Sequence, residues 1–148
     1  MKINSIGIHI KAKNFEKSLS FYQALGFRKV FAYGPDEKIK EDYRGTVFEH
    51  GGCKFEIADG HRAVKPAVFQ ETVSSSKISL MIAVDSMVEM VDRCVKEKIE
   101  VAVPVRHYYW GTLELVVKDP DGVVLVFVCP YSEDEARLVD ADESWMKK

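Results

Sequence analysis

The alternation of apolar and polar residues follows the same order twice along the chain. The segments IGIHIKAKNFEKSLSFYQALGF, from Ile6, and ISLMIAVDSMVEMVDRCVKEKI, from Ile78, each begin with a short apolar run. A polar residue then precedes a stretch whose apolar positions recur every three to four residues. Because side chains repeat with a period of two along a strand and about 3.6 along a helix, each segment predicts a strand followed by an amphipathic helix.

Polar residues mark the start of both predicted helices. Asn14 is placed as an N-cap of the first, and Ser86 with Glu89 has the spacing of a capping box at the second. The apolar positions predicted to be buried are Phe15, Leu19 and Tyr22 in the first helix and Met87, Met90, Val91 and Cys94 in the second. The pattern therefore predicts two short helices, each with one apolar face.

The chain after each helix also repeats. TVFEHGGCKFEIA and ELVVKDPDGVVLVFV both predict a strand, a turn and a strand, with Gly52 and Gly122 at the same place in the turn. RKVFAY and EVAVPV supply one more strand candidate in each half. The sequence thus predicts an α+β fold of two βαβββ modules in tandem, residues 3–60 and 77–130, joined by a polar linker, 61–76, within one domain, 1–130.

A tail, residues 131–148, follows the second module. Ser132 and Glu135 have capping-box spacing, which favours a short helix there. The apolar residues that could attach the tail to the body or to a second subunit are Leu138, Val139, Trp145 and Met146.

Composition excludes several classes of function. The net charge of −2, with charges of both signs interspersed, gives no basic surface for nucleic acid. No apolar run reaches the roughly 20 residues of a membrane span. The three cysteines, Cys53, Cys94 and Cys129, form no CxxC pair, which favours a reducing, cytoplasmic location.

Three motifs resemble the vicinal oxygen chelate superfamily, which includes glyoxalase I, extradiol dioxygenases, fosfomycin-resistance enzymes and bleomycin-resistance proteins. They are FEKSLSFYQALGF, KDPDGVVLVFV and WGT, and the resemblance covers nearly the whole chain, residues 3–130. The resemblance implies that each module curls a mixed sheet into half of a cup and that the two together enclose a cavity. Metal-using members place one metal ligand on the first and one on the last strand of each module.

The four positions that correspond to metal ligands are Gly7, Glu56, Ser79 and Val126. Glycine and valine offer no side-chain donor, and a serine hydroxyl is a poor ligand for these metals. Only Glu56 remains, so we expect no catalytic metal and no other cofactor.

His9 follows Gly7 by two residues and therefore shares its face of the strand. We expect His9 and Glu56 to lie close together on neighbouring strands. Three interpretations stay open: a hydrogen-bonded pair that satisfies two half-buried groups, a metal-free acid/base or ligand-anchoring pair, and a two-ligand metal site completed by His107 or a substrate.

The segment RHYYWGT places a cation, a histidine and three aromatic rings before the last hairpin. Such residues suit a flat or anionic ligand, although they could equally pack against the sheet or a partner subunit. The candidate ligand-binding residues are His9, Glu56, Ser79, Arg106, His107, Tyr109, Trp110 and Val126. By contrast, residues 33–45 are interpreted as a solvated loop, with a mobile lid as the alternative, and His50 and His61 as surface turn residues.

Two functions are compatible with these residues. The first is a bleomycin-resistance-like protein that binds a small aromatic or anionic molecule in its cavity without a catalytic metal. The second is an enzyme, a glyoxalase-like lyase or isomerase or a dioxygenase relative, that uses Glu56 as a base without a metal or with atypical metal ligands. A homodimer is expected, because open curved sheets leave edges to cover.

Overall fold

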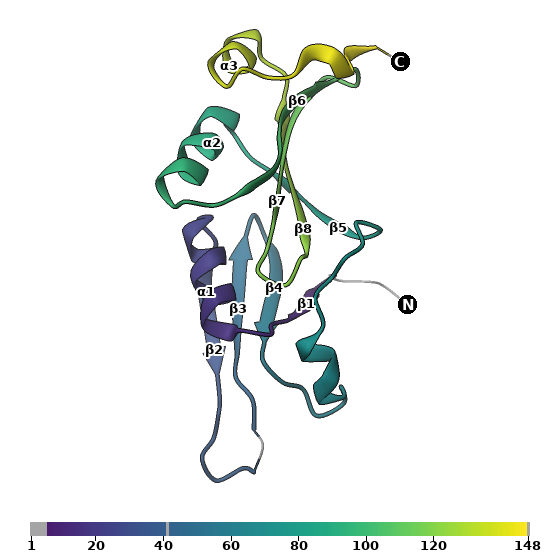
Figure 1. The fold of residues 1–148 in the computed structure, drawn as a ribbon. Helices are drawn as coiled ribbons and strands as arrows, with labels where there is room; N and C mark the ends of the chain where they lie inside the picture. The colour runs from purple at the N-terminus through teal and green to yellow at the C-terminus, as the bar shows by residue number, and fades with distance from the viewer. Residues whose placement is uncertain (1–5, 41, 148) are drawn as a thin grey trace, which may run out of the picture. The chain divides into compact units, whose positions relative to one another are not determined.

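The computed structural model describes residues 6–40 and 42–147, so positions 3–5 of the first predicted module lie outside the described part. The chain divides into two compact units, Met1–Val73 and Ser74–Lys148. The division falls inside the predicted linker, and each unit has its own sheet and its own long helix (Figure 1).

The first unit is a βαβββ module, as predicted. Its sheet has the order β1-β4-β3-β2, in which β1 and β4 are parallel and the other pairs are antiparallel. The elements are β1 (Ile8–Lys11), α1 (Phe15–Ala24), β2 (Arg28–Tyr33), β3 (Gly45–His50), β4 (Cys53–Ala58) and the 3₁₀-helix η1 (Pro66–Gln70).

Helix α1 covers one face of this sheet through an aromatic core. The Asn14 side chain caps the helix by accepting a hydrogen bond from the Lys17 amide at 3.0 Å. Tyr22 is buried and lies with its ring centroid 4.9 Å from that of Phe55 and 5.8 Å from that of Phe48. Phe15 and Tyr22 are buried as predicted, whereas the predicted position Leu19 is only half-buried.

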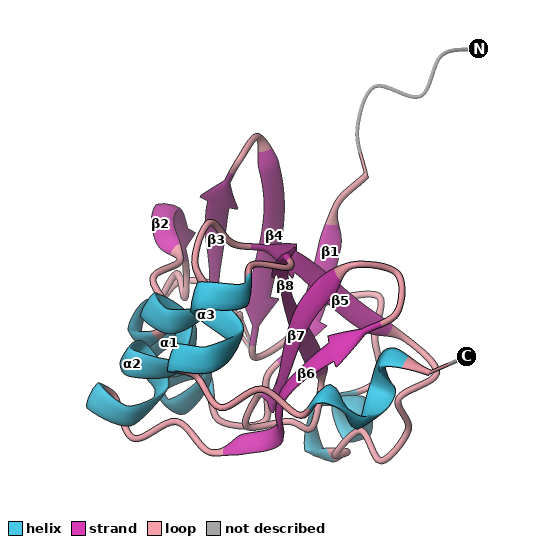
Figure 2. Ribbon diagram, turned by 90° about the horizontal axis from the view of Figure 1, so that it is seen from above, coloured by secondary structure: helices cyan, strands magenta, loops and turns pink. Residues whose placement is uncertain are grey.

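The second unit repeats the same arrangement and adds the tail. Its sheet has the order β5-β8-β7-β6, again with the first pair parallel. The elements are β5 (Ser79–Ala83), α2 (Met87–Lys96), β6 (Val101–Tyr108), β7 (Thr112–Lys118), β8 (Val124–Pro130), α3 (Glu133–Leu138) and the 3₁₀-helix η2 (Glu143–Met146). In Figure 2, α1 and α2 each lie on one side of their own strands, which leaves the other face of each sheet free of these helices.

The DPDG motif is a turn held by its own first residue. The buried Asp119 carboxylate accepts hydrogen bonds from the amides of Asp121, at 2.9 Å, and Val123, at 2.7 Å. Gly122 has a φ of 89°, which favours glycine. These residues therefore shape the hairpin between β7 and β8.

The tail forms the predicted helix, and one of its predicted apolar contacts with the body is present. The Trp145 ring centroid lies 5.9 Å from that of Tyr108 in β6. The backbone of Asp142 adds two hydrogen bonds, since its amide donates to the Val105 carbonyl at 2.9 Å and its carbonyl accepts from the His107 amide at 3.1 Å. Leu138, by contrast, is 70% exposed and does not attach the tail to the second unit, and its contact with a second subunit stays a prediction.

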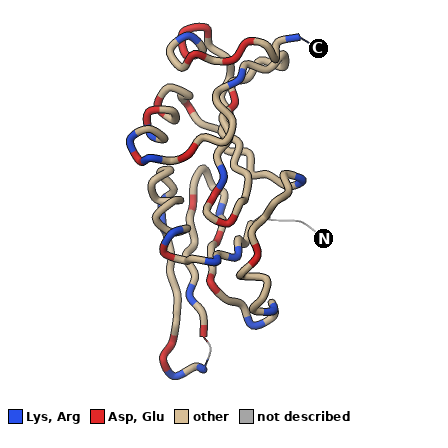
Figure 3. The backbone as a smooth tube through the Cα atoms, in the orientation of Figure 1, with Lys and Arg blue, Asp and Glu red and all other residues tan. Residues whose placement is uncertain are grey.

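Charged residues of both signs are interspersed along the two units (Figure 3). Within the described residues, no helix has the length and apolar character needed to cross a membrane.

Candidate functional site

His9 and Glu56 lie side by side on neighbouring parallel strands. They are direct partners in the register of β1 and β4, and His9 Nε2 is 3.3 Å from Glu56 Oε1. Phe55 packs against Tyr22 of helix α1, and since neighbouring strand residues alternate between faces, Glu56 points away from that helix. The structure therefore brings the pair together on the helix-free face, as strand parity predicts.

Tyr33, at the end of β2, reaches the same carboxylate oxygen. Its hydroxyl donates a hydrogen bond to Glu56 Oε1. Burial, followed by the hydrogen bond to Glu56, raises the pKa of Tyr33 well above its usual value. Tyr33 thus stays a neutral donor, and its contact holds the Glu56 carboxylate in place.

The surroundings of His9 favour its neutral form. Burial lowers its pKa, Lys11 and His61 lower it further, and Glu56 opposes them by raising it. Nε2 of His9 is buried and makes no hydrogen bond of good geometry to any described residue, despite its distance from Glu56. The pair is therefore a close contact without a hydrogen bond of good geometry.

Two further rings complete this group. The His61 ring centroid lies 5.6 Å from that of His9 and 5.9 Å from that of Tyr43, and Tyr43 lies 5.9 Å from Tyr33. Because Tyr33 and His9 both contact Glu56, the contacts form a closed circuit. We call His9, Tyr33, Tyr43, Glu56 and His61 the Glu56 cluster.

Sequence reasoning missed three members of this cluster. Tyr33 and Tyr43 lie at the two ends of a segment interpreted as a solvated loop, and His61 was interpreted as a surface turn residue. One signal was present: Gly45 pairs with Tyr33 across β2 and β3, and a Cβ on Gly45 would collide with the tyrosine ring. A glycine inside a strand often marks such a close approach.

The second unit carries an aromatic group on the sheet face away from α2. The rings of Tyr108 and Trp110 stack in parallel, with centroids 4.5 Å apart and planes 4° from each other, and Trp145 lies 5.9 Å from Tyr108. The Trp110 indole donates to Glu114 Oε1 at 3.0 Å. We call Tyr108, Trp110 and Trp145 the aromatic strip.

Arg106 lies at the edge of the aromatic strip. Its guanidinium carbon is 4.4 Å from the ring centroid of Trp145, a cation–π distance. Its Nε is buried and has no hydrogen-bond partner among the described residues.

The other members of the RHYYWGT segment lie elsewhere. His107 is buried on the opposite face of β6, where its ring stacks on Tyr131 at 3.6 Å and its Nδ1 lies 2.6 Å from Glu143 Oε2. Tyr109 lies in the turn after β6, edge-on to Trp110 at 4.9 Å. The structure therefore separates His107 from Arg106 and gives it contacts with the tail.

The four metal-ligand positions do not supply a metal site. Val126 pairs with Met81 on one side and Val116 on the other, so its face of the sheet is an apolar row. Ser79 precedes Met81 by two residues and shares that face, while Gly7 offers no side chain. Throughout residues 6–40 and 42–147, no three His, Cys, Asp or Glu side chains are grouped so that they could hold a metal ion. The residues at these four positions therefore do not fit a resident metal ion.

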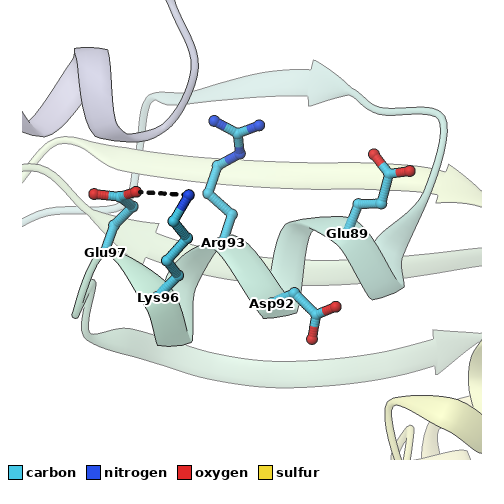
Figure 4. Close-up of a pocket in the computed structure, with 5 residues that line it drawn as sticks. All are labelled: Glu89, Asp92, Arg93, Lys96 and Glu97. Carbon is cyan, nitrogen blue, oxygen red and sulfur yellow. Dashed lines mark ion pairs between the residues drawn. The ribbon is translucent and has the colours of Figure 1, made fainter.

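A shallow hollow follows the exposed side of α2 (Figure 4). Its lining residues all belong to this helix and its end: Glu89, Asp92, Arg93, Lys96 and Glu97. Lys96 Nζ lies 3.9 Å from Glu97 Oε1, and the hollow is lined by charges of both signs. This is typical of a solvated helix surface and does not indicate a ligand site.

A family model described as the Glyoxalase/Bleomycin resistance protein/Dioxygenase superfamily matches residues 2–127. The chain belongs to this superfamily. The resemblance stated from the sequence motifs is thereby confirmed, as is the tandem βαβββ fold. A comparison with curated proteins gives no match.

Solved structures of the superfamily share this fold. A bleomycin resistance determinant encoded on transposon Tn5 has 19% identity and a TM-score of 0.58, over 88% of this chain and 100% of that one. A glyoxalase family protein from Enterococcus faecalis has 20% identity and a TM-score of 0.60, over 86% and 97%. The fosfomycin resistance protein FosX from Mesorhizobium loti has 14% identity and a TM-score of 0.61, over 92% and 97%. At these identities the similarity concerns the fold alone.

Proposed function

We propose that this superfamily member binds a small, flat aromatic or anionic molecule without a catalytic metal. The observation that carries the proposal is the aromatic strip on the helix-free face of the second sheet. Trp110 is 54% exposed, although its indole nitrogen is anchored to Glu114. A large, fixed and exposed ring is the kind of surface on which a planar ligand stacks.

The strand register extends the aromatic strip into an apolar floor. Glu114 of β7 pairs with Arg106 and with Val128, and the adjacent row on the same face holds Val116 and Val126. A ligand on this face would therefore meet rings and a guanidinium at one end and aliphatic side chains at the other. This combination supports a flat apolar body with an anionic group, because the Arg106 guanidinium lies beside the Trp145 ring at one end of the face.

The donor set supports the absence of a catalytic metal. Of the four ligand positions, only Glu56 has a carboxylate, and Tyr33 already donates to it. The proposal is thus sequestration of a ligand by stacking and charge, rather than metal-assisted chemistry.

Ligand binding should quench the tryptophan fluorescence of the protein. The chain has two tryptophans, Trp110 and Trp145, and both belong to the aromatic strip. After treatment with a chelator, titration with a panel of aromatic carboxylates and aromatic antibiotics should give saturable quenching and a rise in melting temperature. Stabilisation of about 2.7 kcal/mol is expected at a ligand concentration of roughly 100 Kd.

The matched control for this titration is an exposed ring in the other unit. Trp110→Leu should weaken binding at least about tenfold, the equivalent of roughly 1.4 kcal/mol, whereas Phe31→Leu should leave it unchanged. A panel without any saturable quenching or thermal shift would contradict the proposal.

A second function is favoured by the Glu56 cluster. A fixed carboxylate beside a neutral histidine and a tyrosine hydroxyl is an arrangement suited to proton transfer, so Glu56 could act as the base of a lyase or isomerase. Metal analysis of protein purified without chelator separates the possibilities. We expect less than a tenth of an equivalent of nickel, zinc or iron per chain; one equivalent that is lost in Glu56→Gln would support an atypical metal enzyme instead.

The homodimer and the cytoplasmic location expected from the sequence stay predictions. Light scattering at micromolar concentration measures the first directly.

A further inference from the structure

The Glu56 cluster surrounds a carboxylate with aromatic rings. The rings of Tyr33 and Tyr43 are nearly perpendicular, at 86°, with centroids 5.9 Å apart. In this edge-to-face contact one ring keeps a face for a cation that approaches from outside the pair, and cation–π attraction acts within about 6 Å of a ring centroid. His61 adds a third ring, tilted by 39° from Tyr43.

The charges around the cluster favour a cation over an anion. Arg44 lies close by, but its guanidinium is taken up by Asp59, at 2.8 Å, and Glu16, at 2.6 Å. Inside the cluster the charged side chain is the Glu56 carboxylate, which contacts His9 and accepts from the Tyr33 hydroxyl.

Two rings of the cluster favour their uncharged forms. Burial lowers the pKa of His9, and burial with the hydrogen bond to Glu56 raises the pKa of Tyr33. Neither shift adds a positive charge that would oppose a cation beside Glu56.

Two glycines leave the space that Tyr33 and Tyr43 occupy. A Cβ on Gly45 would collide with the ring of Tyr33, and a Cβ on Gly60 would lie 2.5 Å from Cβ of Tyr43. Any other residue at either position would displace a tyrosine. The chain just before both glycines is also held together, because the Arg44 amide donates to the Asp59 carboxylate at 3.0 Å.

We propose that the Glu56 cluster binds an alkylated ammonium group, with the rings of Tyr33, Tyr43 and His61 around the cation and Glu56 as its counter-charge. Aromatic rings around a carboxylate match such a group, since its charge is spread over methyl groups that contact ring faces. This inference goes beyond ligand binding at the aromatic strip of the other unit, and it assigns the Glu56 cluster a ligand class that proton transfer by Glu56 does not require.

Choline and its neutral isostere, 3,3-dimethylbutan-1-ol, test the inference, because they differ in charge but hardly in shape. The chain has four histidines, and two of them, His9 and His61, belong to the cluster. In NMR titrations, choline should shift the ring resonances of His9 and His61 saturably in the millimolar range. Those of His50 and His107 should stay in place, and the alcohol should shift none.

Matched variants locate the effect. Glu56→Gln and Tyr43→Leu should each weaken choline binding at least about tenfold. Tyr43→Phe, which keeps the ring, should bind as the parent does. Glu49→Gln, which removes a carboxylate that pairs with Lys54 on the same sheet, should also leave binding unchanged. Melting curves of every variant check that the fold is kept.

Two outcomes would overturn the inference. The first is equal shifts with choline and with the alcohol, and the second is no shift of the His9 and His61 resonances at choline concentrations up to 50-fold above about 1 mM. Loss of choline binding in Glu49→Gln to the same extent as in Glu56→Gln would reduce it to a general charge effect and overturn it too. Tryptophan quenching by aromatic ligands is read in the other unit, so either proposal can fail without the other.

Discussion

Replacement of Phe48 by alanine is expected to lower the free energy of unfolding by about 3–5 kcal/mol, the usual cost of removing a buried phenylalanine ring. Phe48 is fully buried, and its ring stacks on that of Phe55 with centroids 5.0 Å apart. It also contacts Tyr22 and Phe27, so the cavity would be lined by large rings that cannot collapse into it.

Thermal or urea unfolding followed by circular dichroism measures this loss, which corresponds to a fall in melting temperature of roughly 10 °C. Phe31→Ala is the control, since Phe31 lies in the same sheet but is 59% exposed. Its cost should stay below about 1 kcal/mol. Equal losses in the two variants would mean that the aromatic core on α1 does not hold the first unit together.

The fold was predictable because its signals are local and occur twice. Asn14 and Ser86 cap helices as their spacing predicts, and Gly52 and Gly122 both adopt positive φ in their turns. The match between the halves made each assignment support the other, whereas single elements would have been ambiguous.

The candidate site was predictable only where strand alternation decided it. Parity correctly placed His9 beside Glu56. The same rule, applied to adjacent residues, puts Arg106 and His107 on opposite faces of β6, so they could not line one surface. Tyr43 could not be placed from the sequence, because it lies in a loop whose path depends on contacts made far away in the chain.

The attachment of α3 could not be predicted from the sequence either, because it depends on one carboxylate that contacts another helix. Glu135 accepts hydrogen bonds from the Ser86 hydroxyl, at 2.5 Å, and the Met87 amide, at 2.7 Å. It therefore satisfies donors at the start of α2 that no residue of that helix can satisfy. Capping-box spacing predicted a role for Glu135 within its own helix, but 48 residues separate it from Met87.

Glu135→Gln is expected to lower the free energy of unfolding by about 2 kcal/mol at pH 7, because the side-chain amide cannot replace a carboxylate that accepts from two donors. Burial alone would raise the pKa of Glu135, but hydrogen bonds from Ser86 and from the Met87 amide outweigh it and lower the pKa below its usual value. A carboxyl with a lowered folded-state pKa stabilises the fold above the unfolded pKa, about 4.3 for glutamate, and loses this contribution as the pH falls through the folded-state pKa.

The difference in stability between the parent and Glu135→Gln should therefore be constant from about pH 6 to 7 and shrink below about pH 4. Urea unfolding across this range measures it. Glu133→Gln removes an exposed carboxylate from the same helix turn and should cost only about 0.5 kcal/mol, the size of a helix-end charge effect. If the two variants lost the same stability, or if the loss in Glu135→Gln did not depend on pH, the carboxylate of Glu135 would not be what joins α3 to α2.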